Sequence, residues 1–431
     1  MRLPLDIAAT SVSTAPAARV TPAGTRLPRS ESPSVRPIAR STVRRAVQHA
    51  LALACITVGA SCRPRIPPAL GAEPLGDVQT TVLLIGDAGD PGRHARAGAE
   101  PVLRALARAA SERADRTTVV FLGDNVYDDG VPPEEGSPGH ARAESILRRQ
   151  LTAEDGIPPV VRRIFVPGNH DWNDHGRRRD PRGADRVRAQ RDVLRRLDGS
   201  GAATLSPPAS CPGPEVHDVG PRLRLVALDS EWWLQPGGGA GACTESGVPH
   251  DSASSVDALR AATATAGDRH VVVVAHHPLL TGGEHGGHCT RWLSLCSIKR
   301  LFSGGNWQDT PSRANARMRQ AITAALRDRP ALLYAAGHDH TLQVLRGTGG
   351  SAPAARYLAV SGAGIYGNQS QVKCLDESLA AIRAPGFMRL DVRADGSARL
   401  TVLTVDRDGN ATERARVWLT RDDSSTTPCG R

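Results

Sequence analysis

The chain is poor in aromatic residues and in lysine. Of its 431 residues 3% are aromatic, and Lys299 and Lys373 are the only lysines, a bias that we attribute to coding and not to function. The body has no internal repeat and no apolar run of the ~20 residues that a transmembrane helix needs. Apolar residues make up 40% and charged residues 23%, which excludes a largely disordered chain and allows a sizeable buried core.

The net charge of +10 comes mostly from the N-terminal end. Residues 1–65 contain ten arginines and two acidic residues, so the rest of the chain has a net charge of only +2. Because the body is nearly neutral, the high isoelectric point does not indicate nucleic-acid binding, and we expect no nucleic-acid partner.

The N-terminal end predicts export. An apolar run of 15 residues at 46–60 follows two arginines, which is typical of a signal peptide and too short for a membrane span. Small residues precede Cys62 as in a lipoprotein processing site, so signal cleavage and a lipid anchor at Cys62 both remain open, and any membrane contact is expected there. A buried helix is the alternative, which the prolines at 64, 67 and 68 disfavour. We expect a periplasmic, secreted or lipid-anchored protein at the cell surface.

The body has no CxxC pair, so a thiolate zinc cluster is not expected. Apart from Cys55 and Cys62, six widely spaced cysteines remain, which indicates disulfides in an oxidising compartment. These are Cys211, Cys243, Cys289, Cys296, Cys374 and Cys429. Cys289–Cys296 is the one pairing that we expect, because both lie in one loop, and free buried thiols are the alternative.

Short apolar runs that end in glycine and polar residues recur along the body. Five of them have strand length, and helical patterns at 101–114 and 313–327 alternate with them, which favours an α/β architecture. The runs are 81–85, 119–122, 164–166, 271–275 and 332–336. The C-terminal part differs, with three strands expected in an antiparallel meander at 387–392, 398–405 and 414–419. Irregular surface loops are expected at 128–141, 173–191 and 235–250.

The polar residues that follow these strands form a metal-ligand set. Placed in one sheet, the five strands bring their carboxyl ends to one crevice. The residues delivered there are Asp87, Asp124, Asn169, His276, His338 and His340. A single Gly-Asp or His-x-His is usually a turn or a surface feature, but the joint set of carboxylates, an amide and imidazoles suits two first-row metal ions. A central carboxylate can bridge two such ions ~3.5–4 Å apart.

The motifs in this order resemble the calcineurin-like metallophosphoesterase superfamily. They are GDAG at 86–89, GDNVY at 123–127, GNHD at 168–171, VVAHHP at 273–278 and GHDH at 337–340. More narrowly, Tyr127, three residues after Asp124, makes the chain similar to the purple acid phosphatases of the tartrate-resistant type. The resemblance spans about residues 80–405 and implies a four-layer α/β/β/α sandwich of two mixed β-sheets flanked by helices. Together with the N-terminal features described above, we expect a leader with a signal peptide or lipoprotein signal (1–65), a linker (66–78), a catalytic domain (79–420) and a tail (421–431).

The resemblance also implies a role for each site residue. A ferric ion would be held by Asp87, Asp124, Tyr127 and His340. A divalent iron, zinc or manganese ion would be held by Asp124, Asn169, His276 and His338, with Asp124 bridging. His170 and His285 correspond to the two histidines that contact the phosphate and assist the leaving group in that family.

The resemblance implies hydrolysis of phosphate monoesters at acidic pH, by attack of a metal-bound hydroxide on phosphorus. Its substrate would be a small phosphorylated compound, whose identity the sequence leaves open, as it does the oligomeric state. The alternatives are a phosphodiesterase or nucleotide pyrophosphatase with manganese or zinc, and a surface binding protein without turnover, which the complete ligand set disfavours. His277 departs from the family, which often has an aromatic residue there, and the insertions at 173–191 and 235–250 are expected to reshape access to the crevice.

Overall fold

The computed structural model describes most of the chain after residue 65. The described residues are 66–71, 73, 76–91, 100–153, 156–176, 178–236, 242–287, 306–347 and 354–421. The expected leader and the Cys289–Cys296 pairing lie outside them. All described residues belong to one compact unit.

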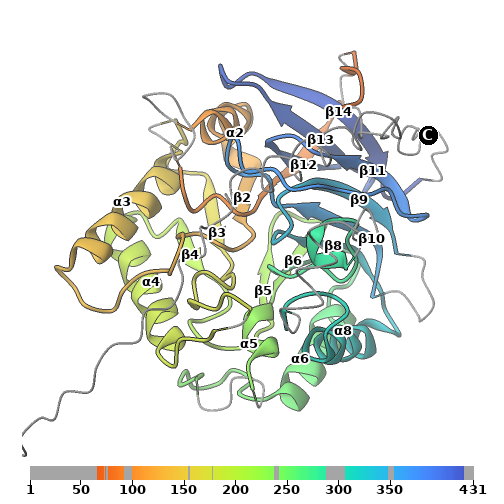
Figure 1. Cartoon of the computed structure of the whole chain (residues 1–431). Helices are drawn as coiled ribbons and strands as arrows, with labels where there is room; N and C mark the ends of the chain where they lie inside the picture. The colour runs from red at the N-terminus through yellow and green to blue at the C-terminus, as the bar shows by residue number, and fades with distance from the viewer. Residues whose placement is uncertain are drawn as a thin grey trace, which may run out of the picture. The chain divides into compact units, whose positions relative to one another are not determined.

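The first of two seven-stranded sheets combines the N-terminal strands with the C-terminal meander (Figure 1). Its order is β14 (Ala411–Trp418), β13 (Ala398–Val405), β12 (Gly386–Arg393), β1 (Val78–Ile85), β2 (Thr117–Phe121), β3 (Arg162–Phe165) and β4 (Ala203–Leu205). Strands β1 to β4 are parallel, whereas β12, β13 and β14 pair antiparallel. The expected meander is therefore confirmed, and it extends the sheet at the edge of β1.

The second sheet holds the central part of the chain. Its order is β11 (Ser378–Ile382), β9 (Leu342–Arg346), β10 (Ala355–Ser361), β8 (Ala331–Ala336), β7 (His270–Val274), β6 (Leu223–Ala227) and β5 (Glu215–Asp218). The five strands expected in one sheet are thus divided, with β1, β2 and β3 in the first sheet and β7 and β8 in the second. All five are apolar on both faces, so their residues gave no sign of which strands pair with which.

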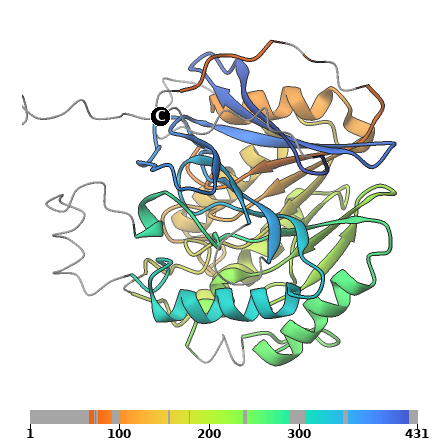
Figure 2. The same ribbon diagram turned by 90° about the vertical axis from the view of Figure 1, so that its right-hand side faces the viewer.

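Helices cover the outer faces of both sheets, which gives the expected four-layer sandwich (Figure 2). Helix α2 (Pro101–Ser111) packs on the first sheet, while α6 (Ser252–Ala264) and α8 (Arg313–Leu326) cover the second. Along β1, Val82 and Leu84 belong to the core between the sheets, and Leu83 and Ile85 belong to the core that includes α2. Because successive strand residues face opposite sides, a strand buried on both sides needs an uninterrupted apolar run.

The arginine-rich segment 173–191, expected as a loop, is helical in its second half. Helix α4 runs over Gly183–Leu197 and follows α3 (Pro138–Thr152), which likewise begins within the expected loop 128–141. In α4 the buried side chains include Val187, Val193 and Leu194. Arginines separate the members of this narrow apolar stripe in the sequence, so the composition of the segment did not indicate a helix.

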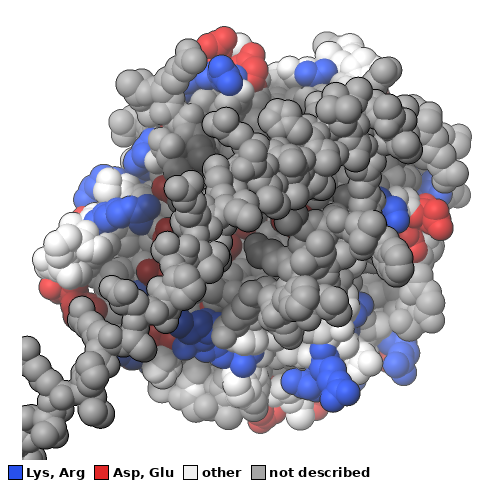
Figure 3. Space-filling view, viewed as in Figure 1, with Lys and Arg blue, Asp and Glu red and all other residues white. Residues whose placement is uncertain are grey.

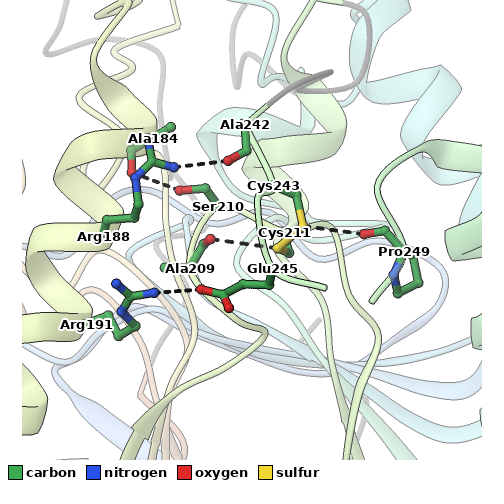
Figure 4. The surroundings of a disulfide bond; sticks show 10 residues. All are labelled: Ala184, Arg188, Arg191, Ala209, Ser210, Cys211, Ala242, Cys243, Glu245 and Pro249. Carbon is green, nitrogen blue, oxygen red and sulfur yellow. Dashed lines mark hydrogen bonds and ion pairs between the residues drawn. A yellow bond between two sulfur atoms is a disulfide. The ribbon is translucent and has the colours of Figure 1, made fainter. Parts of the chain in front are cut away.

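A disulfide joins Cys211 to Cys243, 32 residues apart (Figure 4). The loop that carries Cys243 is also held to α4, because Arg188 donates to the Ala242 carbonyl and Arg191 pairs with Glu245. Cys374 is disulfide-bonded as well. The expected use of cysteines in disulfides is thereby confirmed for the described cysteines.

The described surface carries charges of both signs. Lys and Arg side chains are interspersed with Asp and Glu on the described part of the face in Figure 3, as expected for a nearly neutral body. Among the described residues, no helix is long and apolar enough to cross a membrane.

Candidate metal centre

The carboxyl ends of strands from both sheets meet at one place. Gly86, which follows β1, donates its N–H to the carbonyl of Ser361 at the end of β10, 2.7 Å away. This bond links the first sheet to the second beside the ends of β7 and β8. The expected crevice therefore forms between two sheets instead of along one.

One cluster of ligand atoms surrounds the hydroxyl of Tyr127. Its oxygen lies 3.1 Å from Oδ1 of Asp87, 3.0 Å from Oδ2 of Asp124 and 3.1 Å from Nε2 of His340. Asp87, Asp124 and Tyr127 are all at most 5% exposed. A hydroxyl has one proton and can donate it to only one of these three atoms.

A second cluster lies on the other side of Asp124. The Oδ1 atom of Asn169 is 3.0 Å from Nε2 of His276 and 3.1 Å from Nδ1 of His338. Nε2 of His276 is also 3.4 Å from Oδ1 of Asp124. Asp124 thus directs one carboxylate oxygen toward each cluster, as a bridging ligand would.

Hydrogen bonds to main-chain carbonyls fix the orientation of two imidazoles. Nδ1 of His276 lies 2.8 Å from the Leu122 carbonyl, and Nδ1 of His340 lies 3.0 Å from the Asn368 carbonyl. A carbonyl only accepts, so each Nδ1 carries a proton, and Nε2 of each ring points into the clusters. Such a bond to the other ring nitrogen is typical of histidines that bind metals.

The backbone is strained where it presents these side chains. Asp87, Asp124 and His338 have φ values of 59°, 53° and 67°, in the left-handed region that residues with a side chain rarely adopt. Gly123, with φ of 93°, allows His276 to approach so closely that a Cβ there would lie 2.4 Å from its Nδ1. Strain of this kind gathers at functional sites, where the surrounding fold holds it.

The charge balance of the clusters fits bound cations. No Lys or Arg among the described residues pairs with the buried carboxylates of Asp87 or Asp124, and Nε2 of His276 faces Oδ1 of Asn169, which has no proton to share. Burial and the charges of Asp124 and Asp87 raise the pKa of Tyr127 well above its usual range. Burial lowers the pKa of His340, but the hydrogen bond and charge of Asp87 outweigh it and raise that pKa to about 9. The site thus attracts positive charge, which metal ions would supply.

Two sets of buried ligand atoms meet the spacing that a metal ion requires. The atoms of Asp87, Asp124 and His276 all lie within 4.8 Å of one another, and so do those of His276, His338 and His277, the last of which is not a predicted ligand. The donors are carboxylate oxygens and imidazole nitrogens without a thiolate, which suits iron, zinc or manganese.

His170 and His285, the two other predicted site residues, lie at the mouth of this centre. The side chain of His170 is 23% exposed, with Nδ1 against the Asp128 carbonyl and Nε2 4.0 Å from Oδ2 of Asp124. His285, 30% exposed on a 3-10 turn (η2, Glu284–Gly286), packs its ring 3.9 Å from that of His338. All nine predicted site residues are therefore in contact within one assembly.

Residues 80–342 match the model of the calcineurin-like phosphoesterase family. The chain belongs to this family. Its members are phosphoester hydrolases that hold metal ions, and the recognised motifs all lie within the matched residues. No curated protein matches the chain.

Three solved structures are similar to this phosphoesterase at low identity. A purple acid phosphatase, PPD1, from yellow lupin (Lupinus luteus) seeds is 12% identical with a TM-score of 0.50, covering 82% of this chain and 57% of that one. GAP50, the anchor in the inner membrane complex of Plasmodium, is 15% identical with a TM-score of 0.47, covering 81% and 91%. PhoD is 12% identical with a TM-score of 0.46, covering 82% and 70%. At 12% identity, the likeness to the lupin structure shows the fold alone.

The phosphoesterase motifs contain a buried carboxylate, Asp171, that was not among the predicted site residues. Asp171, the last residue of GNHD, accepts hydrogen bonds from the backbone N–H groups of Asn125, Val126 and Gly168 at 2.8–3.2 Å. It also accepts one from Nδ2 of Asn125. Asp171 thereby joins the loop of Asp124 to the loop of Asn169, and its place inside a motif was the available signal.

His277, the departure from the family pattern, is fully buried. Ser230 Oγ accepts from the N–H groups of His276 and His277, which leaves its proton for Nδ1 of His277, 2.9 Å away. Nε2 of His277 therefore carries the ring proton and faces Oε2 of Glu231 at 3.6 Å. The two nitrogens of this buried imidazole therefore face buried polar groups.

Proposed function

We propose that this phosphoesterase is an exported acid phosphatase of the purple acid phosphatase type that hydrolyses phosphate monoesters. The ferric ion would lie among Asp87, Asp124, Tyr127 and His340. A divalent iron, zinc or manganese ion would lie among Asp124, Asn169, His276 and His338. The observation that carries the proposal is the Tyr127 hydroxyl within 3.1 Å of two carboxylates and an imidazole, because a phenolate is a ligand that stabilises ferric iron.

When bound, the two ions would activate water and polarise the phosphoryl oxygens. The protein residues then have separate tasks. His170 donates its Nδ1 proton to the Asp128 carbonyl, which directs Nε2 toward the centre, where it would contact the phosphate. Nδ1 of His285 lies 2.8 Å from Oδ1 of Asp309, and the partly exposed ring would protonate the leaving oxygen.

Export is part of the proposal. The disulfide between Cys211 and Cys243 is consistent with an oxidising compartment. The predicted signal peptide in the leader would direct the chain to export. The periplasmic, secreted and Cys62-anchored forms are three alternatives, which fractionation of cells that express the full chain distinguishes. The substrate is proposed to be a small phosphorylated compound.

The visible spectrum and metal content of the protein isolated from an oxidising compartment test the assignment. A purple or pink protein with about two metal ions per chain, one of them iron, is expected. A colourless protein with zinc or manganese would overturn the purple acid phosphatase assignment and favour a phosphodiesterase or nucleotide pyrophosphatase. Vanadate-sensitive hydrolysis of p-nitrophenyl phosphate would exclude a binding protein without turnover.

A further inference from the structure

Asp174, near the start of the arginine-rich segment 173–191, is 1% exposed and is hydrogen-bonded to Asn169 of the candidate metal centre. Its carboxylate accepts an unusual number of hydrogen bonds for a residue outside the recognised motifs. The donors are the backbone N–H of Gly176, Nε of Arg179, Nε2 of Gln235, Nε1 of Trp307 and Nε2 of Gln308, at 2.8–3.2 Å. These donors come from three separate parts of the chain, which the single carboxylate holds together.

The main-chain carbonyl of Asp174 sets the orientation of a proposed metal ligand. It accepts a hydrogen bond of 2.8 Å from Nδ2 of Asn169, and the N–H of Asp174 donates to the Asn169 carbonyl. Because the amide nitrogen is used in this way, Oδ1 of Asn169 must face His276 and His338. A flipped amide would direct N–H groups at the cation site.

The carboxylate of Asp174 reaches the other side of the centre through the segment 306–310. It binds the side chains of Trp307 and Gln308, and the next residue, Asp309, holds Nδ1 of His285 at 2.8 Å. The N–H of Thr310 donates to the His285 carbonyl at 2.9 Å, so the same segment fixes both the main chain and the ring of His285.

We propose that Asp174 is a positioning residue of the phosphatase site, which orients the Asn169 amide and places His285 through Trp307, Gln308 and Asp309. The inference rests on the proposed function, since it assigns the proton donor of that reaction to His285. Asp174 does not touch the reacting atoms. This role explains why the second residue of the segment 173–191, which was expected to be a surface loop, is a buried acid.

Leaving-group dependence separates this role from a purely structural one. Phenolate is a much stronger base than p-nitrophenolate, so phenyl phosphate depends far more on a placed proton donor. A misplaced His285 therefore lowers kcat for phenyl phosphate more than for p-nitrophenyl phosphate. General loss of folded enzyme lowers both rates by the same factor.

The test compares Asp174→Asn with the wild type on both substrates. We expect kcat for phenyl phosphate to fall about tenfold to a hundredfold, with a much smaller fall for p-nitrophenyl phosphate. The matched control is Asp391→Asn, an equally buried carboxylate in β12 bound to Thr81 and Arg389, which is expected to leave the ratio of the two rates unchanged. Equal losses on the two substrates, or a ratio like that of the control, would overturn the proposal.

A double variant and a structure complete the design. In the presence of His285→Ala, the Asp174→Asn change is expected to have no further effect on the ratio, because both act on one proton transfer. If Asp174→Asn does not fold, Trp307→Phe removes one of the same hydrogen bonds and is expected to change the ratio in the same direction; an unchanged ratio would count against the proposal.

A crystal structure of the metal-free Asp174→Asn variant tests the proposal without any measurement of activity. Displacement of residues 306–310 and of the His285 ring is expected, and an unmoved His285–Asp309 pair would overturn the proposal. If His285→Ala itself leaves the ratio of the two rates unchanged, His285 is not the proton donor, and that part of the proposed function is wrong. The structure then still decides whether Asp174 places that residue.

Discussion

The hydroxyl oxygen of Tyr127 lies 3.0 Å from Oδ2 of Asp124, only three residues earlier on the same loop. The left-handed backbone of Asp124 turns its carboxylate back toward the tyrosine, and His340 approaches the pair from the second sheet. Two carboxylates, a phenol and an imidazole thus meet at a point where one proton cannot satisfy all of them.

Tyr127→Phe tests the phenol as a ligand. On the proposed function, the variant is expected to lose the visible absorption and to bind less iron, because the phenolate proposed to stabilise ferric iron is gone. Absorption spectra and metal content of both proteins measure this. The matched control is Tyr357→Phe, whose hydroxyl faces the Trp418 carbonyl at 3.5 Å, and which is expected to keep the colour. A Tyr127→Phe protein that stays purple would remove Tyr127 from the ligand set.

Asp171→Ala tests whether Asp171 holds the loop of Asp124 to the loop of Asn169. Removing the carboxylate leaves several buried N–H donors without an acceptor, so we expect the free energy of unfolding to fall by roughly 3 kcal/mol. Urea unfolding of the metal-free protein measures the change without a contribution from metal loss. Asp257→Ala, in an exposed pair on α6, is expected to change it by less than about 0.5 kcal/mol. Equal effects of the two substitutions would contradict the conclusion that Asp171 holds the Asp124 loop and the Asn169 loop together.

Asp229 predicts a specific dependence of stability on pH. Burial raises the pKa of its carboxyl from 3.8 to about 7, although N–H groups of Trp232 and Trp172 favour the charged form. The folded state therefore keeps a proton that the unfolded state releases between these values, so this contribution to stability is full below pH ~4 and is lost as the pH rises to ~7. The loss amounts to at most about 4 kcal/mol.

Unfolding curves of metal-free wild type and Asp229→Asn across this pH range give the test. The asparagine does not titrate, so the stability of the wild type relative to the variant is expected to decline from pH 4 to 7. A difference that stays constant would mean that Asp229 is ionised throughout.

The disulfide makes a separate prediction. Cys211 and Cys243 close a loop of 32 residues in sequence separation, so their replacement by alanine is expected to cost roughly 3–4 kcal/mol through the added entropy of the unfolded chain. Guanidinium unfolding under non-reducing conditions leaves the other disulfides in place and measures the difference. A variant as stable as the wild type would show that Arg188 and Arg191 alone hold the Cys243 loop to α4.

The strands and the candidate site residues could be predicted from short sequence patterns, because these patterns depend on interactions between residues close in the chain. A strand buried on both faces needs a continuous apolar run, so the five runs were recognisable, and the donor chemistry of the residues after them predicted a metal site. The motif order around Asp87, Asp124 and His338 was enough to place the chain in its family. Even the Tyr127 spacing was visible without a structure.

Only the tertiary structure decided which strands share a sheet and which side chains support the ligands. Strand pairing depends on contacts between residues far apart in the chain, and apolar runs of the same kind can pair in many orders. Asp174 and Asp309 lie in segments without apolar periodicity or a recognised motif, and their role arises from hydrogen bonds that cross more than 20 residues. Such bonds exist only after folding has brought their partners together, and for that reason the sequence by itself determined the metal-binding chemistry, while the fold decided how it is held.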